Sequence, residues 1–281
     1  MAPQPQTTVA RVRRSNAAVL TAATALGFLA ALSVSAPILI AADPLAINPS
    51  HVLASPDLVH PLGTDELGRD LLARVVYGGR VSLTVAAAAV LIAGTLGVIS
   101  GVAIAFFSPR LESAMMRIID VLVSLPEIFV AIVVLAFLGG SFWALIGTIG
   151  VLYFPQFARV AYGMARSIRA RDHVTAAVSL GAGRLWLIRR EILPNMRSVI
   201  AVQASFTFSF AMLLEAGLSF LGLGVHPPTP SWGQMIGTLK DYIFINPWPV
   251  LVPSIVLFAV VLSINVLGDW LQDRLNPELR R

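Results

Sequence analysis

Long apolar stretches alternate with shorter polar segments along the chain. Six of the apolar stretches are long enough to cross a bilayer, at approximately residues 17–42, 81–107, 118–139, 142–162, 198–223 and 250–270. A helix needs roughly 20 apolar residues to cross a bilayer core that is about 30 Å thick. The pattern therefore predicts an all-α membrane protein with six transmembrane helices.

The composition supports a location in the bilayer. Hydrophobic residues make up 57% of the 281 residues and charged residues only 12%, and the mean hydropathy is +0.80. Soluble domains carry about 25% charged residues. The first apolar stretch follows Arg11, Arg13 and Arg14, as a secretory signal peptide would, but it is longer than the roughly 7 to 15 apolar residues of such a peptide. We therefore expect it to remain as the first transmembrane helix.

Positive charge is distributed unevenly between the segments that join the predicted helices. Cytoplasmic loops of membrane proteins are enriched in Lys and Arg. With a cytoplasmic N-terminus, sixteen of the 20 basic residues fall inside, whereas the outer segments carry only Arg69, Arg74, Arg80 and Lys240. The bias predicts cytoplasmic tails at residues 1–16 and 271–281, and it explains the net charge of +5 without nucleic acid. The inner residues are Arg11, Arg13, Arg14, Arg110, Arg117, Arg159, Arg166, Arg169, Arg171, Arg184, Arg189, Arg190, Arg197, Arg274, Arg280 and Arg281.

Two outer segments are longer than simple turns. In residues 43–80, Thr64 is a candidate helix cap, and Leu67, Leu71, Leu72 and Val75 recur at helical spacing, which predicts an interfacial amphipathic helix. In residues 224–249, the prolines of HPPTPSWGQM disfavour a helix there, and the aromatic residues suit a membrane interface. We expect both segments to form a docking surface for an outer partner. The candidate contacts are Asp65, Arg69, Pro227, Pro228 and Trp232.

Several kinds of chemistry are missing from the sequence. There is no cysteine, and no two of the four histidines have metal-ligand spacing on a helix. A phosphate-binding loop of the GxxxxGK type is also absent, since the only lysine, Lys240, is preceded by GTL and followed by Asp241. The GxSxG and HExxH motifs do not occur. We therefore expect a chain that is no enzyme and that binds no ATP, metal or cofactor itself.

Four acidic residues lie within or near the predicted transmembrane helices: Asp120, Glu127, Glu215 and Asp269. Charges at membrane depth are costly and usually face the protein interior or a water-filled path. Glu127 follows Pro126. We expect Pro126 to kink the third predicted helix and Pro155 to kink the fourth. Glu215 is a candidate either for a pathway or subunit interface or for a structural hydrogen bond. The pathway candidates are Glu127, Glu215, Ser219 and Phe220.

The longest polar gap that the charge bias places inside contains the segment TAAVSLGAGRLWLIRREILP, residues 175–194. Two amphipathic pieces flank the glycine-containing break at Gly181, which predicts a helix, a turn and a second helix. Leu185, Ile188 and Ile192 form an apolar stripe on the second piece, and Pro194 is expected to close it. Such a unit fits a groove in a cytoplasmic partner. A hairpin on the membrane surface without a partner is the alternative.

The same segment resembles the coupling motif of ABC importer permeases, summarised as EAA, three residues, Gly, nine residues, Ile, one residue, Leu-Pro. Thr175 replaces the usual Glu and Glu191 the usual Ile. The matching positions are Ala176, Ala177, Gly181, Leu193 and Pro194. The stretches HPLGTDELGRDLLARVVYGGRVSL and EAGLSFLGLGVHPPTPSWGQM are similar to signatures of the second permease subunit of dipeptide, oligopeptide and nickel importers. The resemblance covers nearly the whole chain from about residue 15.

The resemblance implies half of a type I importer channel with a five-helix core at residues 81–270, which includes the coupling segment 163–197. It implies a homologous second permease, two ATPase domains that carry ATP and Mg, and an extracytoplasmic substrate-binding protein. The substrate class it implies is a peptide. Residues implied in ATPase coupling are Thr175, Ala176, Ala177, Gly181, Ala182, Leu185, Leu193 and Pro194. The alternatives are an ion-coupled secondary carrier, a non-transporting scaffold, and the same importer with nickel or another small solute.

Overall fold

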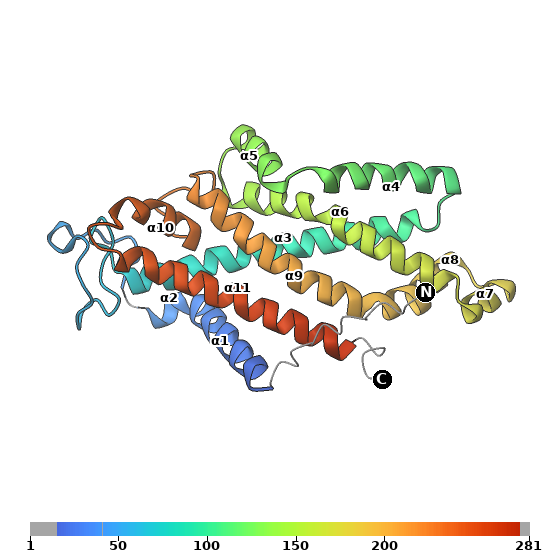
Figure 1. The fold of residues 1–281 in the computed structure, drawn as a ribbon, viewed down its shortest axis with the longest axis horizontal. Coiled ribbons are helices and arrows are strands. Elements are labelled where there is room, and N and C mark those ends of the chain that lie inside the picture. Colours follow the sequence, from blue (N-terminus) through green and yellow to red (C-terminus); the bar gives the residue numbers. More distant parts are fainter. Residues whose placement is uncertain (1–15, 41, 276–281) are drawn as a thin grey trace, which may run out of the picture.

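The computed structural model describes residues 16–40 and 42–275, and the predicted tail segments 1–15 and 276–281 lie outside the described residues. The described chain is an elongated helical bundle with loops at one end and a small helical projection at the other (Figure 1). We call the end formed by residues 42–70 and 221–247 the loop end. We call residues 172–187, which form the projection, the α7–α8 unit.

Five helices among the described residues are long and apolar enough to cross a bilayer, and the remaining helices are shorter. This all-helical architecture confirms the predicted fold class. The long helices are α1 (Asn16–Val34), α3 (Leu71–Ile104), α6 (Phe142–Arg169), α9 (Leu193–Phe220) and α11 (Trp248–Leu275). The others are α2 (Ala36–Leu39), η1 (Pro49–His51), α4 (Pro109–Ser124), α5 (Glu127–Leu138), α7 (Asp172–Ser179), α8 (Arg184–Leu187), the π-helical turn η2 (Ile188–Ile192), α10 (Trp232–Leu239) and η3 (Lys240–Tyr242).

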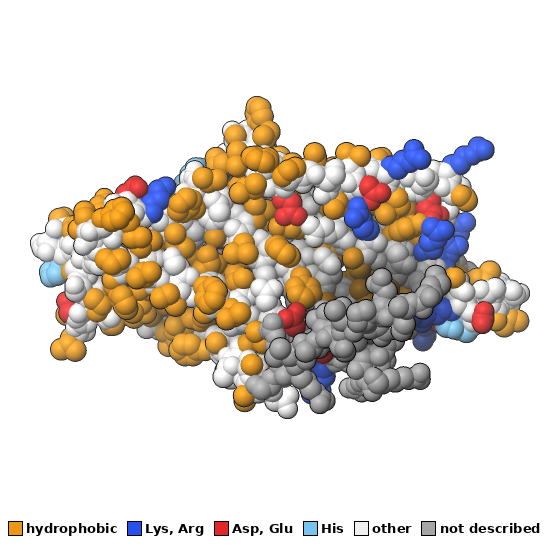
Figure 2. Space-filling model, viewed as in Figure 1, with side chains coloured by type: hydrophobic (Ala, Val, Ile, Leu, Met, Phe, Trp, Pro, Cys, Tyr) orange, Lys and Arg blue, Asp and Glu red, His pale blue; other side chains and the backbone are white. Residues whose placement is uncertain are grey.

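The surface of the bundle is divided by type of side chain. Hydrophobic side chains cover its middle in the view of Figure 2, and most of the visible Lys and Arg side chains gather toward the end that carries the α7–α8 unit. An apolar surface of this extent would be unfavourable in water but suits contact with lipid. The basic end is the one that the charge bias of the sequence predicts to be cytoplasmic.

The predicted third transmembrane helix is broken in two. The axes of α4 and α5 differ in direction by 87°, and the break falls at Leu125 and Pro126. A residue that precedes proline is driven out of the helical region, and Leu125 is extended with ψ of 134°. Pro155 instead lies within α6, whose helix continues through it. The third predicted crossing therefore exists only as a bent pair (Figure 1).

The centre of the bundle is the close pair α3 and α6. Gly97 and Gly101 of α3 make this approach possible, because a Cβ on Gly97 would lie 2.3 Å from the Cβ of Phe157. A Cβ on Gly101 would meet the backbone oxygen of Ala158 at the same distance. Small residues allow helix backbones to approach in lipid, where no hydrophobic force brings helices together.

The prediction of a separate interfacial helix within residues 43–80 is wrong. Apart from the short helix η1, the segment is a loop up to Asp70, and α3 then runs without interruption from Leu71 through the second predicted transmembrane helix. Asp70 is the N-cap, because its side chain accepts a hydrogen bond from the backbone N–H of Ala73 at 2.7 Å. Thr64, the predicted cap, instead bridges the loop by donating to the carbonyl of His51 and accepting from the backbone N–H of Ala54. Residues 71–80 do have helical spacing, but nothing in the sequence separates them from the apolar run that follows. They therefore form the first turns of one long helix rather than a helix of their own.

The second outer segment is only partly a loop. Its prolines keep residues up to Ser231 out of a helix, as predicted, but α10 begins at Trp232 and η3 follows it. The Ser231 hydroxyl caps α10 by accepting from the backbone N–H of Gln234 at 3.2 Å. Residues 271–275, predicted as tail, continue α11 instead.

Candidate functional sites

The α7–α8 unit is the helix, turn and helix that the sequence predicts. Gly181 separates the two helices with a φ of +89°, a conformation that costs little only for glycine. The unit projects beyond the long helices at one end of the molecule (Figure 1). The glycine turn thus allows two short helices to fold into a compact projection at the end of the bundle.

The unit has a buried root and an exposed apolar tip. Val174 and Leu187 are 1% and 4% exposed and pack with the ends of α3, α6 and α9. Leu180, by contrast, is 90% exposed. Val178, Leu185 and Trp186 are also exposed, and Arg184, Arg189 and Arg190 lie among them on the exposed surface. An anchored knob with an uncovered apolar tip has the shape of a docking element.

Polar contacts tie this unit to the bundle. His173 lies 3.4 Å from Glu191 across the turn, measured from Nε2 to Oε2. At the end of α6, the Arg169 guanidinium lies over the Phe106 ring at 4.4 Å and donates to the Ala105 carbonyl. The first contact ties α7 to η2, and the contacts of Arg169 hold the end of α6, from which the unit starts, against the end of α3.

The predicted coupling residues fall at different depths. Thr175, Ala176 and Gly181 are exposed, whereas Ala177 and Ala182 are half-buried. The Thr175 hydroxyl donates to the Arg171 carbonyl of the preceding turn at 3.3 Å. Leu185 is exposed and Ile192 fully buried, so the predicted apolar stripe faces two environments rather than one.

The prediction that Pro194 ends the second helical piece is wrong. The chain continues from Arg184 to Phe220 as one 37-residue helix, and Leu193 and Pro194 are exposed on it. The π-helical turn η2 immediately precedes this proline. Proline lacks an N–H and clashes with the carbonyl four residues before it in an α-helix, and a wider π turn relieves both problems.

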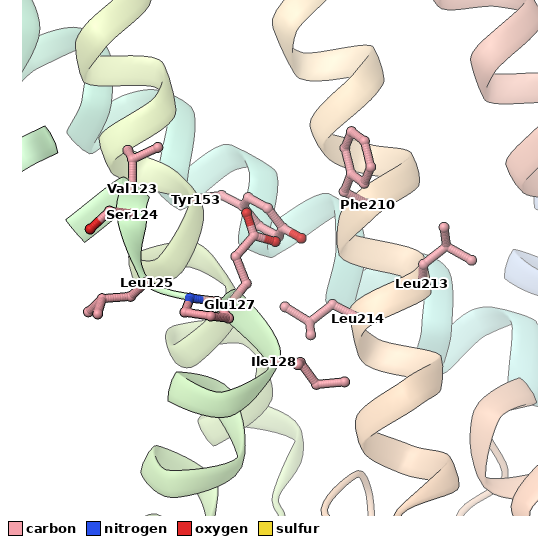
Figure 3. A pocket seen from close by; sticks show the side chains of 10 residues that line it. Val123, Ser124, Leu125, Glu127, Ile128, Tyr153, Phe210, Leu213 and Leu214 are labelled. Atoms are coloured by element: carbon pink, nitrogen blue, oxygen red, sulfur yellow. The ribbon is translucent and has the colours of Figure 1, made fainter. Parts of the chain in front are cut away.

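The bend between α4 and α5 opens a cavity of about 580 Å³. Figure 3 shows the side chains of Glu127 and Tyr153 pointing toward each other, with Phe210, Leu213 and Leu214 of α9 on the opposite wall. The Glu127 carboxylate accepts from Gln156 Nε2 at 2.8 Å and from the Tyr153 hydroxyl. Glu127 is half-buried, so an acidic group lines the cavity together with Ser124, Tyr153 and several apolar side chains.

Glu215 lies in a different environment, because its side chain is completely buried. Its Oε1 accepts from the Ser219 hydroxyl at 2.8 Å, and the hydroxyls of Ser82 and Ser231 also face the carboxyl group. Its Oε2 makes no hydrogen bond with another described residue. The group therefore joins α9 to α3 and to the start of α10. Phe220, one turn beyond, is exposed and lies 4.4 Å below the Lys240 ammonium.

A dense polar network organises the loop end. Asp65 Oδ2 lies 2.6 Å from Arg69 Nε and 3.0 Å from Arg74 Nε, and its Oδ1 accepts from the backbone N–H of Arg69. Glu66 pairs with Arg69 at 2.5 Å, and burial, helped by the nearby Asp65 charge, raises the pKa of Glu66. The Trp232 indole N–H donates to the Val75 carbonyl at 2.8 Å. The network ties the 42–70 loop to α3, and Trp232 ties α10 to the same helix.

The five candidate docking residues divide into two groups. Asp65, Arg69 and Trp232 are almost completely buried within this chain, whereas Pro227 and Pro228 are exposed. Sequence reasoning passed over the most exposed apolar residues of the loop end, Leu58 and Phe244, at 103% and 99%. The sequence could have indicated these residues, because they belong to apolar groups within polar loops, in PDLVHP and YIFINP. Within residues 16–40 and 42–275, no group of three or more carboxylate or histidine side chains is arranged for a metal ion.

These features define a class of protein, a polytopic helical membrane protein with a projecting helical knob at one end and a polar loop layer at the other. Residues 93–281 match the family described as binding-protein-dependent transport system inner membrane component. The chain belongs to this family. Its curated relatives place it in the branch of ABC importer permeases that the sequence resembles, so the family prediction is confirmed.

The relatives match over most of their length. The di/tripeptide transport system permease protein DppC of Pseudomonas aeruginosa is 39% identical over 219 residues, which are 78% of this chain and 72% of that protein. The dipeptide transport system permease protein DppC of Alkalihalophilus pseudofirmus is 37% identical, with 89% and 82% covered. The glutathione transport system permease protein GsiD of Pectobacterium atrosepticum is 35% identical, with 80% and 75% covered.

A solved structure shares the fold. An inward-facing form of the MetNI methionine ABC transporter superimposes with a TM-score of 0.62 at 19% identity, covering 73% of this chain and 98% of that chain. The likeness supports the type I importer permease architecture.

Proposed function

We propose that this chain forms half of the translocation pathway of an ATP-driven importer for short peptides. Two ATPase domains, which bind ATP and Mg, dock at the α7–α8 unit, a homologous permease completes the pathway, and a substrate-binding protein delivers peptide at the loop end. The curated relatives named for di/tripeptide, dipeptide and glutathione transport support a peptide substrate.

The observation that carries the proposal is the uncovered apolar tip of the α7–α8 unit on its buried root. Burial of Leu180 against a partner would remove its exposed apolar surface from water, at about 25 cal/mol per Å². The root at Val174 and Leu187 transmits displacement of the tip to α6 and α9. The ATPase reaches the pathway through this contact.

Charge supports the membrane orientation of this assembly. Arg166, Arg169, Arg184, Arg189 and Arg190 lie in or beside the α7–α8 unit, which favours a cytoplasmic location for this end. The loop end then faces outward. Pro227, Pro228, Leu58 and Phe244 are exposed there, and they form the contact surface for a binding protein.

The cavity at the α4–α5 bend lies on the proposed pathway. Glu127 is the acidic group there, and its carboxylate is held by two hydrogen-bond donors. Family membership favours the importer over the ion-coupled carrier and the scaffold. Glu215 also fits a carrier poorly, because its side chain is completely buried.

Gly181→Pro tests the coupling role. Proline fixes φ near −65°, which is incompatible with the +89° of Gly181, so the turn between α7 and α8 must rearrange. We expect uptake of a radiolabelled dipeptide by cells to fall to background while the variant still inserts and copurifies with the second permease. Uptake at the wild-type rate would contradict the coupling role.

Gly183→Ala is the matched control. Gly183 is exposed and has an ordinary φ of −75°, and a Cβ added there would have no neighbour within 4 Å. Transport by this variant should remain close to that of the wild type. Loss of transport in both variants would show that the whole segment tolerates no substitution, and it would contradict a specific role for the turn at Gly181.

A further inference from the structure

A second large cavity lies between α1, α3, α9 and α11 and shares no lining residue with the cavity at the α4–α5 bend. Its volume is about 600 Å³. The walls are almost entirely apolar, and they include Leu26 and Ala30 of α1, Leu83 and Ala87 of α3, Phe208 of α9 and Leu267 of α11. We call this cavity the α1 groove.

One cation lines the α1 groove. Arg80 of α3 lies beside Ser33 and Val34 of α1, and it is exposed. Its side chain makes no ion pair or hydrogen bond with another described residue. Arg80 immediately precedes an apolar run that continues to Phe107, so it lies where the bilayer core begins. An unpaired guanidinium at that boundary can pair with an anion from outside the chain.

The shape of the groove follows from a close helix crossing next to Arg80. A Cβ on Gly79 would lie 2.4 Å from the Ser33 hydroxyl oxygen, so only glycine allows α1 to come this close to α3. The groove lining then extends along α3 from Arg80 to Val90. Ten helical residues span about 15 Å. This is half the thickness of a bilayer core about 30 Å thick, the depth that one acyl chain occupies.

We propose that the α1 groove binds one phospholipid from the leaflet that surrounds the loop end. The phosphate pairs with Arg80, and an acyl chain lies along Ala30, Ala87 and Phe208. Arginine forms strong charge-assisted hydrogen bonds with phosphate oxygens. A phospholipid supplies both the anion and the apolar chain, whereas a transmembrane helix from another chain supplies an anion only if it carries an acidic residue at that depth.

The consequence concerns the attachment of α1. Only 11% of its apolar window is buried inside this chain, and it lies outside the residues that match the family. A bound lipid fills the space between α1 and the core helices and so holds α1 in place. This inference does not depend on the identity of the transported substrate.

Native mass spectrometry of the full-length chain, purified from its membrane with the chains that accompany it, tests the proposal. The probes are dioleoyl-phosphatidylglycerol and dioleoylglycerol, which has the same acyl chains without the phosphate. Arg80→Gln should weaken retention of the phospholipid roughly fivefold, the effect of one basic residue near a charged lipid surface, and should leave dioleoylglycerol unchanged. Ala87→Phe should weaken retention of both lipids. Arg110→Gln, an exposed arginine outside the groove, is the matched control.

A photo-crosslink identifies the occupant directly. Replacing Phe208 with benzoyl-phenylalanine keeps an aromatic side chain in the groove, and illumination in the native membrane should yield an adduct with the mass of a phospholipid. A protein adduct would overturn the proposal in favour of a partner helix. Equal phospholipid retention by wild type, Arg80→Gln and Ala87→Phe would overturn it as well, because the bound lipid would then be nonspecific.

Discussion

The two ends of the molecule differ in how completely the chain satisfies its own groups. At the loop end, Asp65 is 1% exposed and pairs with two arginines. Trp232 is equally buried, and its indole N–H is hydrogen-bonded. At the opposite end, Leu180 is 90% exposed on a unit that is anchored only at its root. The loop end therefore contains a buried network whose charges are paired within the chain, besides the exposed side chains of Leu58 and Phe244, whereas the α7–α8 unit presents an apolar tip that the described residues do not cover.

The difference assigns separate tasks to the two ends. A network of buried, paired charges is rigid because each group depends on the others, and removing one partner leaves an uncompensated charge. An exposed apolar knob costs the folded chain little and gains free energy only when a partner covers it. Substitutions in the buried network of the loop end should therefore act on stability, and substitutions at the tip of the α7–α8 unit should act on coupling.

The largest effect on stability should come from Asp65→Ala. The change leaves Arg69 and Arg74 without the carboxylate that holds both, which costs about 3 to 5 kcal/mol for a buried pair. We expect a lower midpoint of thermal unfolding in detergent and faster proteolysis within residues 42–70. Asp57→Ala removes an exposed carboxylate of the same loop that accepts from the backbone N–H groups of Val59 and His60, and its effect on both measurements should be much smaller. Similar destabilisation by both would remove the distinction between the buried network and the loop surface.

Leu180→Asp should have the opposite profile. Because Leu180 makes no buried contact in this chain, the free energy of unfolding should stay within about 0.5 kcal/mol of wild type, as for an exposed substitution. Uptake of labelled dipeptide should fall at least tenfold, because a buried charge in the contact opposes ATPase docking. Val174→Asp, at the buried root, is the contrast and should destabilise the chain. Normal uptake by Leu180→Asp would show that the tip is not a docking surface.

The smallest effects should distinguish the two membrane carboxylates. Glu127→Gln changes a half-buried group in a cavity, and we expect a change in uptake rate of roughly fivefold, about 1 kcal/mol in the barrier. Glu215→Gln keeps the shape of a buried group that accepts from Ser219, so uptake should stay close to wild type. Rate and substrate preference in reconstituted vesicles would check both. An effect of Glu215→Gln on substrate preference would place Glu215 on the pathway.

Much of the fold could be predicted because apolar length and charge bias act locally. The runs around α1, α3, α6, α9 and α11 were identified, as was the break at Gly181. The boundaries of helices were mispredicted where a segment with helical spacing ran directly into a transmembrane apolar run. Residues 71–80 have helical spacing, but their merger with the next apolar run depends on the capping by Asp70 and on the burial of Arg74.

The depth of individual side chains could not be predicted. Glu127 and Glu215 are both glutamates within apolar runs, yet only packing against Ser219, Ser82 and Ser231 seals the second. Pro194 was predicted to end a helix, because the sequence gives no indication of the π turn that accommodates this proline. Trp232 suited a membrane interface by type, but α10 turns it onto Val75.

Docking of an ATPase on the α7–α8 unit can be tested by a photo-crosslink from its tip. Benzoyl-phenylalanine at position 180, illuminated in native membranes, would be followed by purification of the chain and mass spectrometry of the adduct. We expect a covalent adduct with a P-loop ATPase, and no such adduct from the same probe at Phe244 of the loop end. Adducts with lipid alone at position 180 would refute the docking role, because the unit would then be a membrane-surface hairpin.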